Sequence, residues 1–284
     1  MTPGSRVRDH LVFAALVASL SCAHLTPPPG PADQASIDDP SMIALWRMDE
    51  PLTEDTIHDA GPHALHGTAG PGVHTDQGKM GSCRVFNGMH DCFIYVPYTT
   101  ALDSMGTIVV EAQVMASLDE PNPIQTIAAR WGPKEEFQSW ILFLVGSSDP
   151  PAAAQLGIES SNLRGKLLFA LRSDRAPVPQ VFAADGFEPW RVRAWNHVAV
   201  SVDGDRISFY INGRLDSSFP CLGRFRPSRA PLTIGNILAA SYDMGTEVWY
   251  RGLEGTGFSG MIDEFRISPI ERARSWSSPG AGDR

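Results

Sequence analysis

The sequence predicts an all-β protein folded as an antiparallel two-sheet β-sandwich or jelly roll. From Ile43 onward, short apolar or alternating runs are separated by Gly, Pro, Asn and Asp, a pattern typical of strands joined by turns. No helical stretch lies between these runs, which argues against a βαβ sheet. The 26 glycines and 23 prolines also suit a chain with many turns. Because we find no short-period repeat, a propeller or solenoid is not expected.

Length and composition indicate one large domain. The chain has 284 residues, of which 43% are hydrophobic and 19% are charged, enough to bury a sizeable core. Its formal net charge is -9, and no cluster of Lys and Arg interleaves with aromatic residues. Nucleic acid and anionic lipid surfaces are therefore not expected partners.

Residues 1–41 have the features of an export signal followed by a tether. Two arginines precede the apolar run LVFAALVASLS, which is too short to span a bilayer, so we expect residues 1–21 to be a signal peptide. Ser19-Leu20-Ser21-Cys22 resembles the lipobox of bacterial lipoproteins. That resemblance implies acylation of Cys22 and, because Ala23 follows, an anchor in an outer membrane; simple secretion is the alternative. Residues 22–41 are rich in Pro and polar residues and are expected to form a tether.

The folded part is predicted to contain a series of strands and two tight hairpins. In chain order, the strand-like runs are residues 43–48, 83–86, 92–97, 107–116, 125–131, 139–145, 166–172, 195–202, 206–211, 231–237 and 261–267. Asp203-Gly204 and Asn212-Gly213 tolerate the positive φ of two-residue turns, so each is expected to close a hairpin.

A third hairpin is predicted at Asn87-Gly88, between CRVF and MHDC. A two-residue turn there places Cys83 opposite Cys92 in a non-hydrogen-bonded pair. Such a pair has Cα atoms about 4.5 Å apart, within the range that a disulfide accepts. An exported protein permits this bond, and two reduced thiols packed as small apolar side chains are the alternative. Cys221 is then expected to be a free thiol.

The last strand, FSGMIDEFRI, carries an acid in apolar surroundings. Strict alternation places Met261, Asp263, Phe265 and Ile267 on one face of this strand. A buried carboxylate must be hydrogen-bonded, paired with a cation or bound to a metal. After the strand, Ser268-Pro269 and a capping box predict a short helix, which with the tail occupies residues 271–284.

A set of motifs resembles the laminin G-like family of the concanavalin A-like lectin/glucanase fold. The motifs are ALWRMDE, DAGPHALHGT, RVFNG with FIYVP, TIVVEAQV, WNHVAVSVDG, ISFYINGRL, PLTIGN and FSGMIDEFRI. Their order and spacing agree across residues 42–270, which we take as the jelly-roll domain. The resemblance implies two curved sheets packed face to face. The expected core residues are Ile108, Val110, Leu142, Leu144, Val198, Val200, Phe209 and Ile234.

The same resemblance suggests a structural calcium ion. Several members of the superfamily hold Ca²⁺ at the edge of the sandwich with an Asp of the last long strand and oxygen ligands from early in the chain. On this pattern Asp263 would be joined by Asp49 or Glu50 and by the backbone around Asn87 and Gly88. Hard oxygen ligands of this kind suit Ca²⁺. The alternative is a carboxylate that accepts backbone N–H groups or pairs with an arginine, Arg47 or Arg266.

The sequence carries no recognised catalytic signature. Laminarinase-type hydrolases of the same fold place their carboxylates as Glu-x-Asp-x-x-Glu, and no Glu of this chain has Asp two residues later. No Gly-x-Ser-x-Gly elbow is present either. We therefore expect a non-catalytic cell-envelope module that recognises a glycan or an extracellular protein. The alternatives are a glycoside hydrolase or polysaccharide lyase with an atypical active site, and an adhesion role with no small ligand.

Aromatic residues near strand ends are the candidate ligand contacts. Sugar-binding modules stack pyranose rings on exposed aromatics and fix hydroxyl groups with nearby polar side chains. The candidates are Arg130, Trp131, Trp190, Tyr242, Trp249 and Tyr250. Trp46, Trp140 and Trp195 lie within strand-like runs and are expected in the core. Packing beneath a loop is the alternative role for each candidate.

Overall fold

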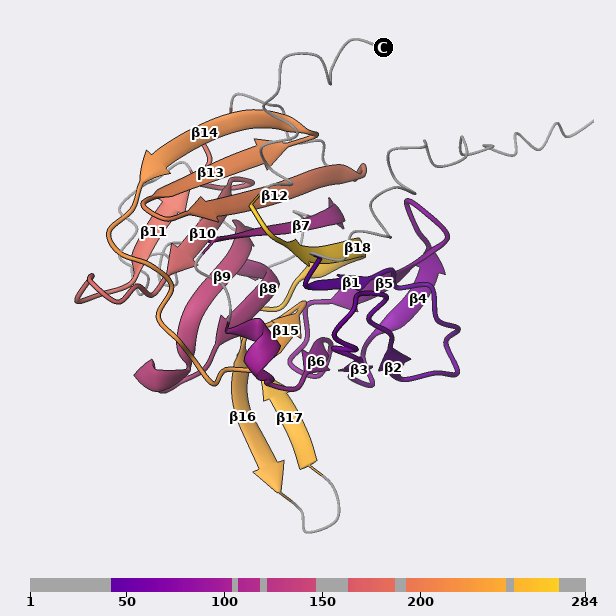
Figure 1. Cartoon of the computed structure of the whole chain (residues 1–284). Helices are drawn as coiled ribbons and strands as arrows, with labels where there is room; N and C mark the ends of the chain where they lie inside the picture. Colours follow the sequence, from indigo (N-terminus) through magenta and orange to yellow (C-terminus); the bar gives the residue numbers. More distant parts are fainter. Residues whose placement is uncertain are drawn as a thin grey trace, which may run out of the picture.

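The computed structural model describes residues 42–103, 107–117, 122–146, 163–186, 193–243 and 248–270. They form two eight-stranded antiparallel sheets and a separate two-stranded hairpin (Figure 1). The predicted all-β sandwich is thus confirmed. Cys22, Trp190 and the segments predicted to form the signal peptide, the tether and the C-terminal helix lie outside the described residues. In the part of the chain that is described, no helix is long and apolar enough to cross a membrane.

The first sheet has the order β14-β13-β12-β7-β18-β5-β4, and β1 also pairs with β18. Its strands are β1 (Ala44–Trp46), β4 (His74–Gln77), β5 (Ser82–Asn87), β7 (Thr107–Ala116), β12 (Asn196–Asp203), β13 (Arg206–Ile211), β14 (Arg214–Pro220) and β18 (Ser259–Ser268). The long central strands β7 and β18 carry the apolar residues that the sequence pattern had indicated.

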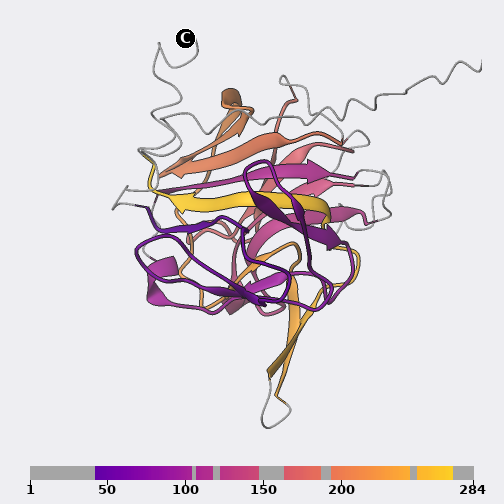
Figure 2. The ribbon, with the colours of Figure 1, turned by 90° about the vertical axis from the view of Figure 1, so that its right-hand side faces the viewer.

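The second sheet has the order β11-β10-β9-β8-β15-β6-β3-β2. Its strands are β2 (Thr56–Ile57), β3 (Gly67–Ala69), β6 (Ile94–Val96), β8 (Ile124–Trp131), β9 (Gln138–Val145), β10 (Leu167–Leu171), β11 (Gln180–Ala183) and β15 (Leu232–Ile234). Two short 3-10 turns, η1 (Thr100–Leu102) and η2 (Glu135–Phe137), lie in loops. The hairpin of β16 (Leu238–Asp243) and β17 (Val248–Gly252) leaves the body of the sandwich (Figures 1 and 2).

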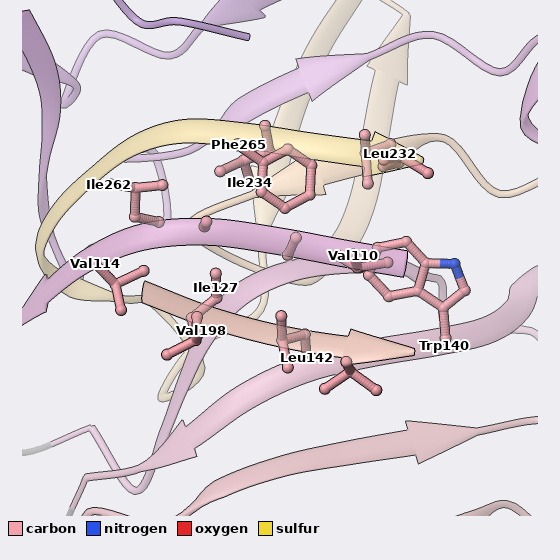
Figure 3. Close-up of a cluster of buried hydrophobic side chains, with 14 of the residues drawn as sticks. Val110, Val114, Ile127, Trp140, Leu142, Val198, Leu232, Ile234, Ile262 and Phe265 are labelled. Carbon is pink, nitrogen blue, oxygen red and sulfur yellow. The ribbon is translucent and has the colours of Figure 1, made fainter. Parts of the chain in front are cut away.

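The main core lies between the two sheets. All eight residues expected there on the basis of the sequence are buried in one cluster. In Figure 3, Val110, Val114, Val198, Ile262 and Phe265 come from the first sheet, and Ile127, Trp140, Leu142, Leu232 and Ile234 from the second. Trp46 and Trp140 are fully buried as predicted, whereas Trp195 is partly exposed just before β12. The alternation of apolar residues therefore predicted the inner faces of both sheets.

Both hairpins of the first sheet are present. Ile211 pairs with Arg214 around Asn212-Gly213, whose φ values of 52° and 78° fit a two-residue turn. Asp203 pairs with Arg206, so the other turn is Gly204-Asp205, one residue later than predicted. Gly204 supplies the positive φ there.

The predicted hairpin at Asn87-Gly88 is wrong, and the predicted Cys83–Cys92 disulfide is wrong with it. β5 pairs with β4 and β18 in the first sheet, while β6 pairs with β3 and β15 in the second. The chain therefore crosses from one sheet to the other between the two cysteines. Cys83 and Cys92 are both free and buried, and so is Cys221, whose free thiol was predicted. Turn residues alone do not reveal such a crossing, because Asn-Gly also suits a connection between sheets.

Candidate functional site

Asp263 lies beside a β-bulge, which the sequence pattern did not reveal. β18 pairs with β7 at Asp263–Gln113 and next at Arg266–Glu111, so β18 contains one extra residue between these pairs. Glu264 has a positive φ of 49° there. Ile262 belongs to the core before the bulge, and Phe265 and Ile267 belong to it afterwards. The prediction that Asp263 shares a face with Phe265 and Ile267 is therefore wrong, because the bulge reverses the alternation.

The turn between β4 and β5 covers Asp263 on the outer face of the sheet. The Met80 N–H donates to Asp263 Oδ2 over 2.9 Å, while Oδ1 is buried without a hydrogen-bond partner among the described residues. Burial raises the pKa of Asp263 to about 7, against backbone N–H groups of the turn that lower it. Burial, together with the charge of Asp263, also raises the pKa of Cys83 to about 12.

The other predicted calcium ligands are only partly gathered around this acid. Asp49 Oδ1 accepts the Ser82 N–H over 2.8 Å, so Asp49 holds the same turn as Asp263. Glu50 is bound elsewhere, to the His58 N–H and to the buried guanidinium of Arg84. Asn87 pairs with Ser259, at the opposite end of the contact between β5 and β18, so Asn87 and Gly88 do not meet Asp263.

The fit of Ca²⁺ to this turn thus depends on two carboxylates and the backbone. No group of three or more His, Cys, Asp or Glu side chains suited to a metal occurs in the described parts of the chain. The unpartnered Asp263 Oδ1 is nevertheless the kind of buried oxygen that a hard cation satisfies. Calcium binding remains a prediction, with Asp263 and Asp49 as its side-chain ligands.

A pocket with aromatic walls lies on the outer face of the second sheet. It encloses about 340 Å³ and is lined by Tyr95, Gly132, Pro133, Lys134, Phe137, Pro231, Leu238, Ala239 and Tyr250. We call it the aromatic pocket. The rings of Tyr95 and Tyr250 stack with centroids 3.6 Å apart and planes 16° from parallel. Burial and a hydrogen bond with Tyr250 raise the pKa of Tyr95, so the Tyr95 phenol is protonated at neutral pH. The pocket therefore combines flat apolar surfaces with hydroxyl groups.

Three elements position the aromatic pocket. Ile94 and Val96 point into the core, so the alternation of β6 sends Tyr95 to the outer face. Tyr250 comes from the base of the β16–β17 hairpin, which is held by the Gly252 N–H on the His90 carbonyl over 2.7 Å. Phe137 ends the η2 turn, and its own carbonyl accepts the Gly132 N–H over 2.9 Å.

Arginines fix the η2 turn from outside. Glu135 Oε1 accepts hydrogen bonds from Arg172 and from Arg226, the latter over 2.7 Å. These two contacts lower the pKa of Glu135 below its usual range. The turn is consequently held by charged groups on a neighbouring loop and strand end, which keeps Phe137 in place beside the pocket.

A second pocket shares Phe137 with the aromatic pocket. It encloses about 450 Å³ and is lined by Tyr98, Asp103, Glu136, Phe137, Pro227, Ser228 and Arg229. We call it the Arg229 pocket. Asp103 is engaged through both oxygens: Oδ1 accepts from Arg130 over 3.0 Å and Oδ2 from the Tyr98 hydroxyl over 2.5 Å. Because Phe137 lines both pockets, the two cavities flank the η2 turn.

The structure separates the six predicted ligand residues. Tyr250 lines the aromatic pocket, and Trp131 is half-buried against the outer apolar cluster of the second sheet. Arg130 is buried and bound to the Leu102, Ser228 and Ala230 carbonyls, so its assignment as a ligand contact is wrong. Tyr242 and Trp249 pair with each other in the projecting hairpin, and Trp190 lies outside the described residues.

Sequence reasoning predicted only Tyr250 of the aromatic pocket and missed its other residues, among them Tyr95, Lys134 and Phe137. Tyr95 stands between two core residues of a predicted strand, and that alternation was an available signal for an outward aromatic. Lys134 and Phe137 lie in a loop whose position depends on Arg172 and Arg226, far away in the sequence. No local sequence pattern predicts these contacts of the loop with Arg172 and Arg226.

A family model described as the concanavalin A-like lectin/glucanases superfamily matches residues 110–277. No curated protein sequence matches the chain. Among solved structures, domain 4 of AbnA, a GH43 extracellular arabinanase from Geobacillus stearothermophilus, was determined in complex with arabinotriose. It is 19% identical, with a TM-score of 0.54, and the match covers 84% of this chain and 98% of that chain.

Toxin binding domains have a similar fold. The binding domain of Paraclostridial Mosquitocidal Protein 1 is 13% identical with a TM-score of 0.55, and the match covers 83% of this chain and 51% of that one. A second structure is of botulinum neurotoxin type C, whose cell entry depends on interaction with two ganglioside molecules. It is 13% identical with a TM-score of 0.55, and the match covers 86% of this chain and 52% of that one. This chain spans about half the length of these two toxin chains, and the likeness concerns the fold.

Proposed function

The chain belongs to the concanavalin A-like lectin/glucanases superfamily, and from this membership we propose that it is a non-catalytic module that binds a glycan. The aromatic pocket is the binding site in this proposal. A protein ligand on the cell envelope or outside the cell is the second candidate partner. Membership alone does not choose between these ligands, so the choice depends on the geometry of the pocket.

The stacked pair Tyr95 and Tyr250 is the observation that carries the proposal. Sugar rings have an apolar face that packs on aromatic rings and hydroxyl groups that need hydrogen bonds at the rim. The pocket offers the half-buried rings of Tyr95, Tyr250 and Phe137, with the Lys134 ammonium nearby. Its volume of about 340 Å³ lies in the range of small-ligand sites. Its walls come from β6, the η2 turn and the β16–β17 hairpin.

Proteins of similar fold support the proposal. The arabinanase domain was crystallised with arabinotriose, and the botulinum neurotoxin interacts with gangliosides. Both ligands are carbohydrates or carry carbohydrate. These similarities favour a glycan as the class of ligand for this chain too.

The carboxyl groups of the Arg229 pocket give little support to the alternative that the protein is a glycoside hydrolase. Glycoside hydrolysis needs two carboxyl groups facing the scissile bond, one of them able to donate a proton. Asp103 and Glu136 both line this pocket, but Asp103 already accepts hydrogen bonds from Arg130 and Tyr98. We therefore favour binding without turnover. Release of reducing sugar from a bound glycan would overturn this part of the proposal.

A glycan array followed by titration tests the proposed site. Tyr250→Ala should weaken binding of any glycan found by roughly fivefold to tenfold, because one stacking ring is lost. Tyr250→Phe should retain most of the affinity, since it keeps the ring. Leu253→Ala is a matched control, because Leu253 is exposed next to the same hairpin and lines neither pocket. A silent array, or full binding by Tyr250→Ala, would contradict the assignment.

We also propose that the protein is exported, with Cys22 as an acylated N-terminus that anchors it to a membrane. The lipobox-like segment before Cys22 and the Pro-rich residues after it support this location. A flexible tether would let the pocket reach ligands away from the membrane. Mass spectrometry of the mature N-terminus checks the proposal; an unmodified chain starting at another residue would refute acylation.

A further inference from the structure

We propose that the glycan bound by this chain is an anionic oligosaccharide, with its carboxylate or sulfate group on Arg229 and a neighbouring sugar on the Tyr95–Tyr250 stack. The inference depends on the proposed function, because it names the class of ligand for the same site. It is carried by the charges around the η2 turn and by the arrangement of the two pockets.

The region around the η2 turn is cationic although the chain as a whole is acidic. Five cationic side chains lie in it (Arg130, Lys134, Arg172, Arg226 and Arg229) against three acids (Asp103, Glu135 and Glu136). The excess of two positive charges contrasts with a formal net charge of -9 for the whole sequence. A local field of this sign attracts anions to the site.

Lys134 and Arg229, the two cationic residues that line the pockets, form no ion pair with the described part of the chain. Both side chains are exposed. The nearby acids are engaged instead by buried or half-buried arginines: Asp103 by Arg130, and Glu135 by Arg172 and Arg226. Glu136 is the single acid lining either pocket that lacks such a partner, and its oxygens can accept hydrogen bonds from sugar hydroxyls.

The adjacency of the pockets indicates an oligosaccharide. Phe137 lines both cavities, so a ligand that fills the aromatic pocket and also reaches Arg229 extends past this residue. The two volumes, about 340 and 450 Å³, leave room for more than one sugar ring. A guanidinium binds a carboxylate or sulfate through two parallel hydrogen bonds, which a neutral sugar cannot reproduce.

Matched acidic and neutral probes test the proposal. We would titrate the full mature chain with galacturonic acid oligomers and their methyl esters, and with oligosaccharides of a sulfated galactan and their desulfated forms. At least one acidic probe should bind roughly tenfold to hundredfold more tightly than its neutral form. That preference should shrink as NaCl rises from about 50 to about 300 mM, because salt screens the charges.

Three variants locate the acidic group. Arg229→Gln should remove most of the preference for the acidic probe, because it weakens binding of the acidic form far more than binding of the neutral form. Lys134→Gln should reduce the preference for the acidic probe in part. Arg206→Gln makes the same change at an exposed arginine in the first sheet, far from both pockets in the strand order, and should have no effect. Thermal unfolding of each variant confirms that the fold is retained.

The outcomes separate this inference from the proposed function. If acidic and neutral forms bind equally and Tyr250→Ala weakens both, glycan binding stands and the anionic ligand is refuted. A preference for the acid that survives Arg229→Gln and Lys134→Gln together refutes the location. If no glycan of either kind binds, the proposed function fails and this inference fails with it.

Discussion

Asp263 makes the stability of the folded protein depend on pH. Burial raises its pKa from an ordinary value of 3.8 to about 7, so the folded chain holds this proton more tightly than the unfolded chain. The stabilising contribution is fully present below about pH 4 and is lost as the pH rises through 7. Above pH 7 the buried charge costs roughly 4 kcal/mol relative to acid pH.

Asp263→Asn should remove this dependence in a metal-free protein. The amide has the same shape, keeps an oxygen for the Met80 N–H and carries no charge at any pH. We expect the variant to be more stable than the wild type at pH 8 and similar at pH 4, as measured by urea unfolding in the presence of a chelator. Equal stability at both pH values would show that the carboxylate is solvated in the folded state.

Calcium should reverse the order of stability of the wild type and Asp263→Asn. A cation bound by Asp263 and Asp49 would stabilise the charged carboxylate and, in excess, the folded state by roughly 2.7 kcal/mol at a hundred times Kd. The wild type should then melt higher in calcium than in chelator, whereas Asp263→Asn should respond little. An identical melting temperature of the wild type in both conditions would rule out this ion.

Arg130 was predicted to contact the ligand, but in the structure it holds parts of the fold together. Its guanidinium is buried, which lowers its pKa, and it joins η1, β8 and the segment before β15 through three carbonyls and Asp103. Arg130→Met should destabilise the fold by about 3–5 kcal/mol, because buried acceptors and a carboxylate lose their partner. Arg229→Met is the exposed control and should unfold like the wild type; a neutral Arg130→Met would contradict this role.

At the scale of elements, the sequence predicted strands better than their connections. β7 and β12 were recognised by their alternating apolar residues and β9 by an uninterrupted apolar run, and all three were found to within a residue of their ends. β4 was missed because none of its residues is buried, so nothing in its pattern separates it from a loop. The bulge at Asp263 was also hidden, since one extra residue leaves local composition unchanged while it reverses the faces.

The crossing between β5 and β6 predicts the state of the cysteines. Since these strands lie in different sheets, Cys83, Cys92 and Cys221 should all be free thiols. Burial raises the pKa of Cys92 to about 11 and that of Cys83 to about 12, so alkylation of the folded protein at pH 8 should be slow. In denaturant without a reductant, all three should be alkylated, as peptide mapping would show. A linked peptide pair would contradict the placement of β5 and β6.

At the scale of the whole molecule, the candidate site could be predicted only in part. The fold followed from alternation spread over many strands, each contributing an independent signal. The aromatic pocket instead depends on a few contacts between loops distant in the sequence, such as Glu135 with Arg226 and Tyr95 with Tyr250. Of its residues, Tyr250 alone was predicted, because it was an aromatic outside the strand-like runs. Loop packing decides such a site, and loops carry little periodic pattern.

The projecting hairpin allows a test that separates the body of the molecule from its appendage. β16 and β17 pair with each other and with no other described strand, and Ser241 pairs with Tyr250. Replacing residues 242–249 by Asn-Gly would join these partners by a two-residue turn and remove both Tyr242 and Trp249. The melting temperature should change by no more than about 3 °C, because the core between the sheets is untouched.

Ligand binding by this shortened chain decides between the two groups of aromatic residues. Tyr250 and Tyr95 remain, and the Gly252 N–H still holds the base of the hairpin on the His90 carbonyl, so the aromatic pocket should keep its shape. We therefore expect affinity for the bound glycan within about twofold of the wild type, while Tyr250→Ala in the same background should weaken it. If shortening alone abolishes binding in a chain that still melts normally, Tyr242 and Trp249 on the hairpin make the contact with the glycan, and the aromatic pocket does not bind it.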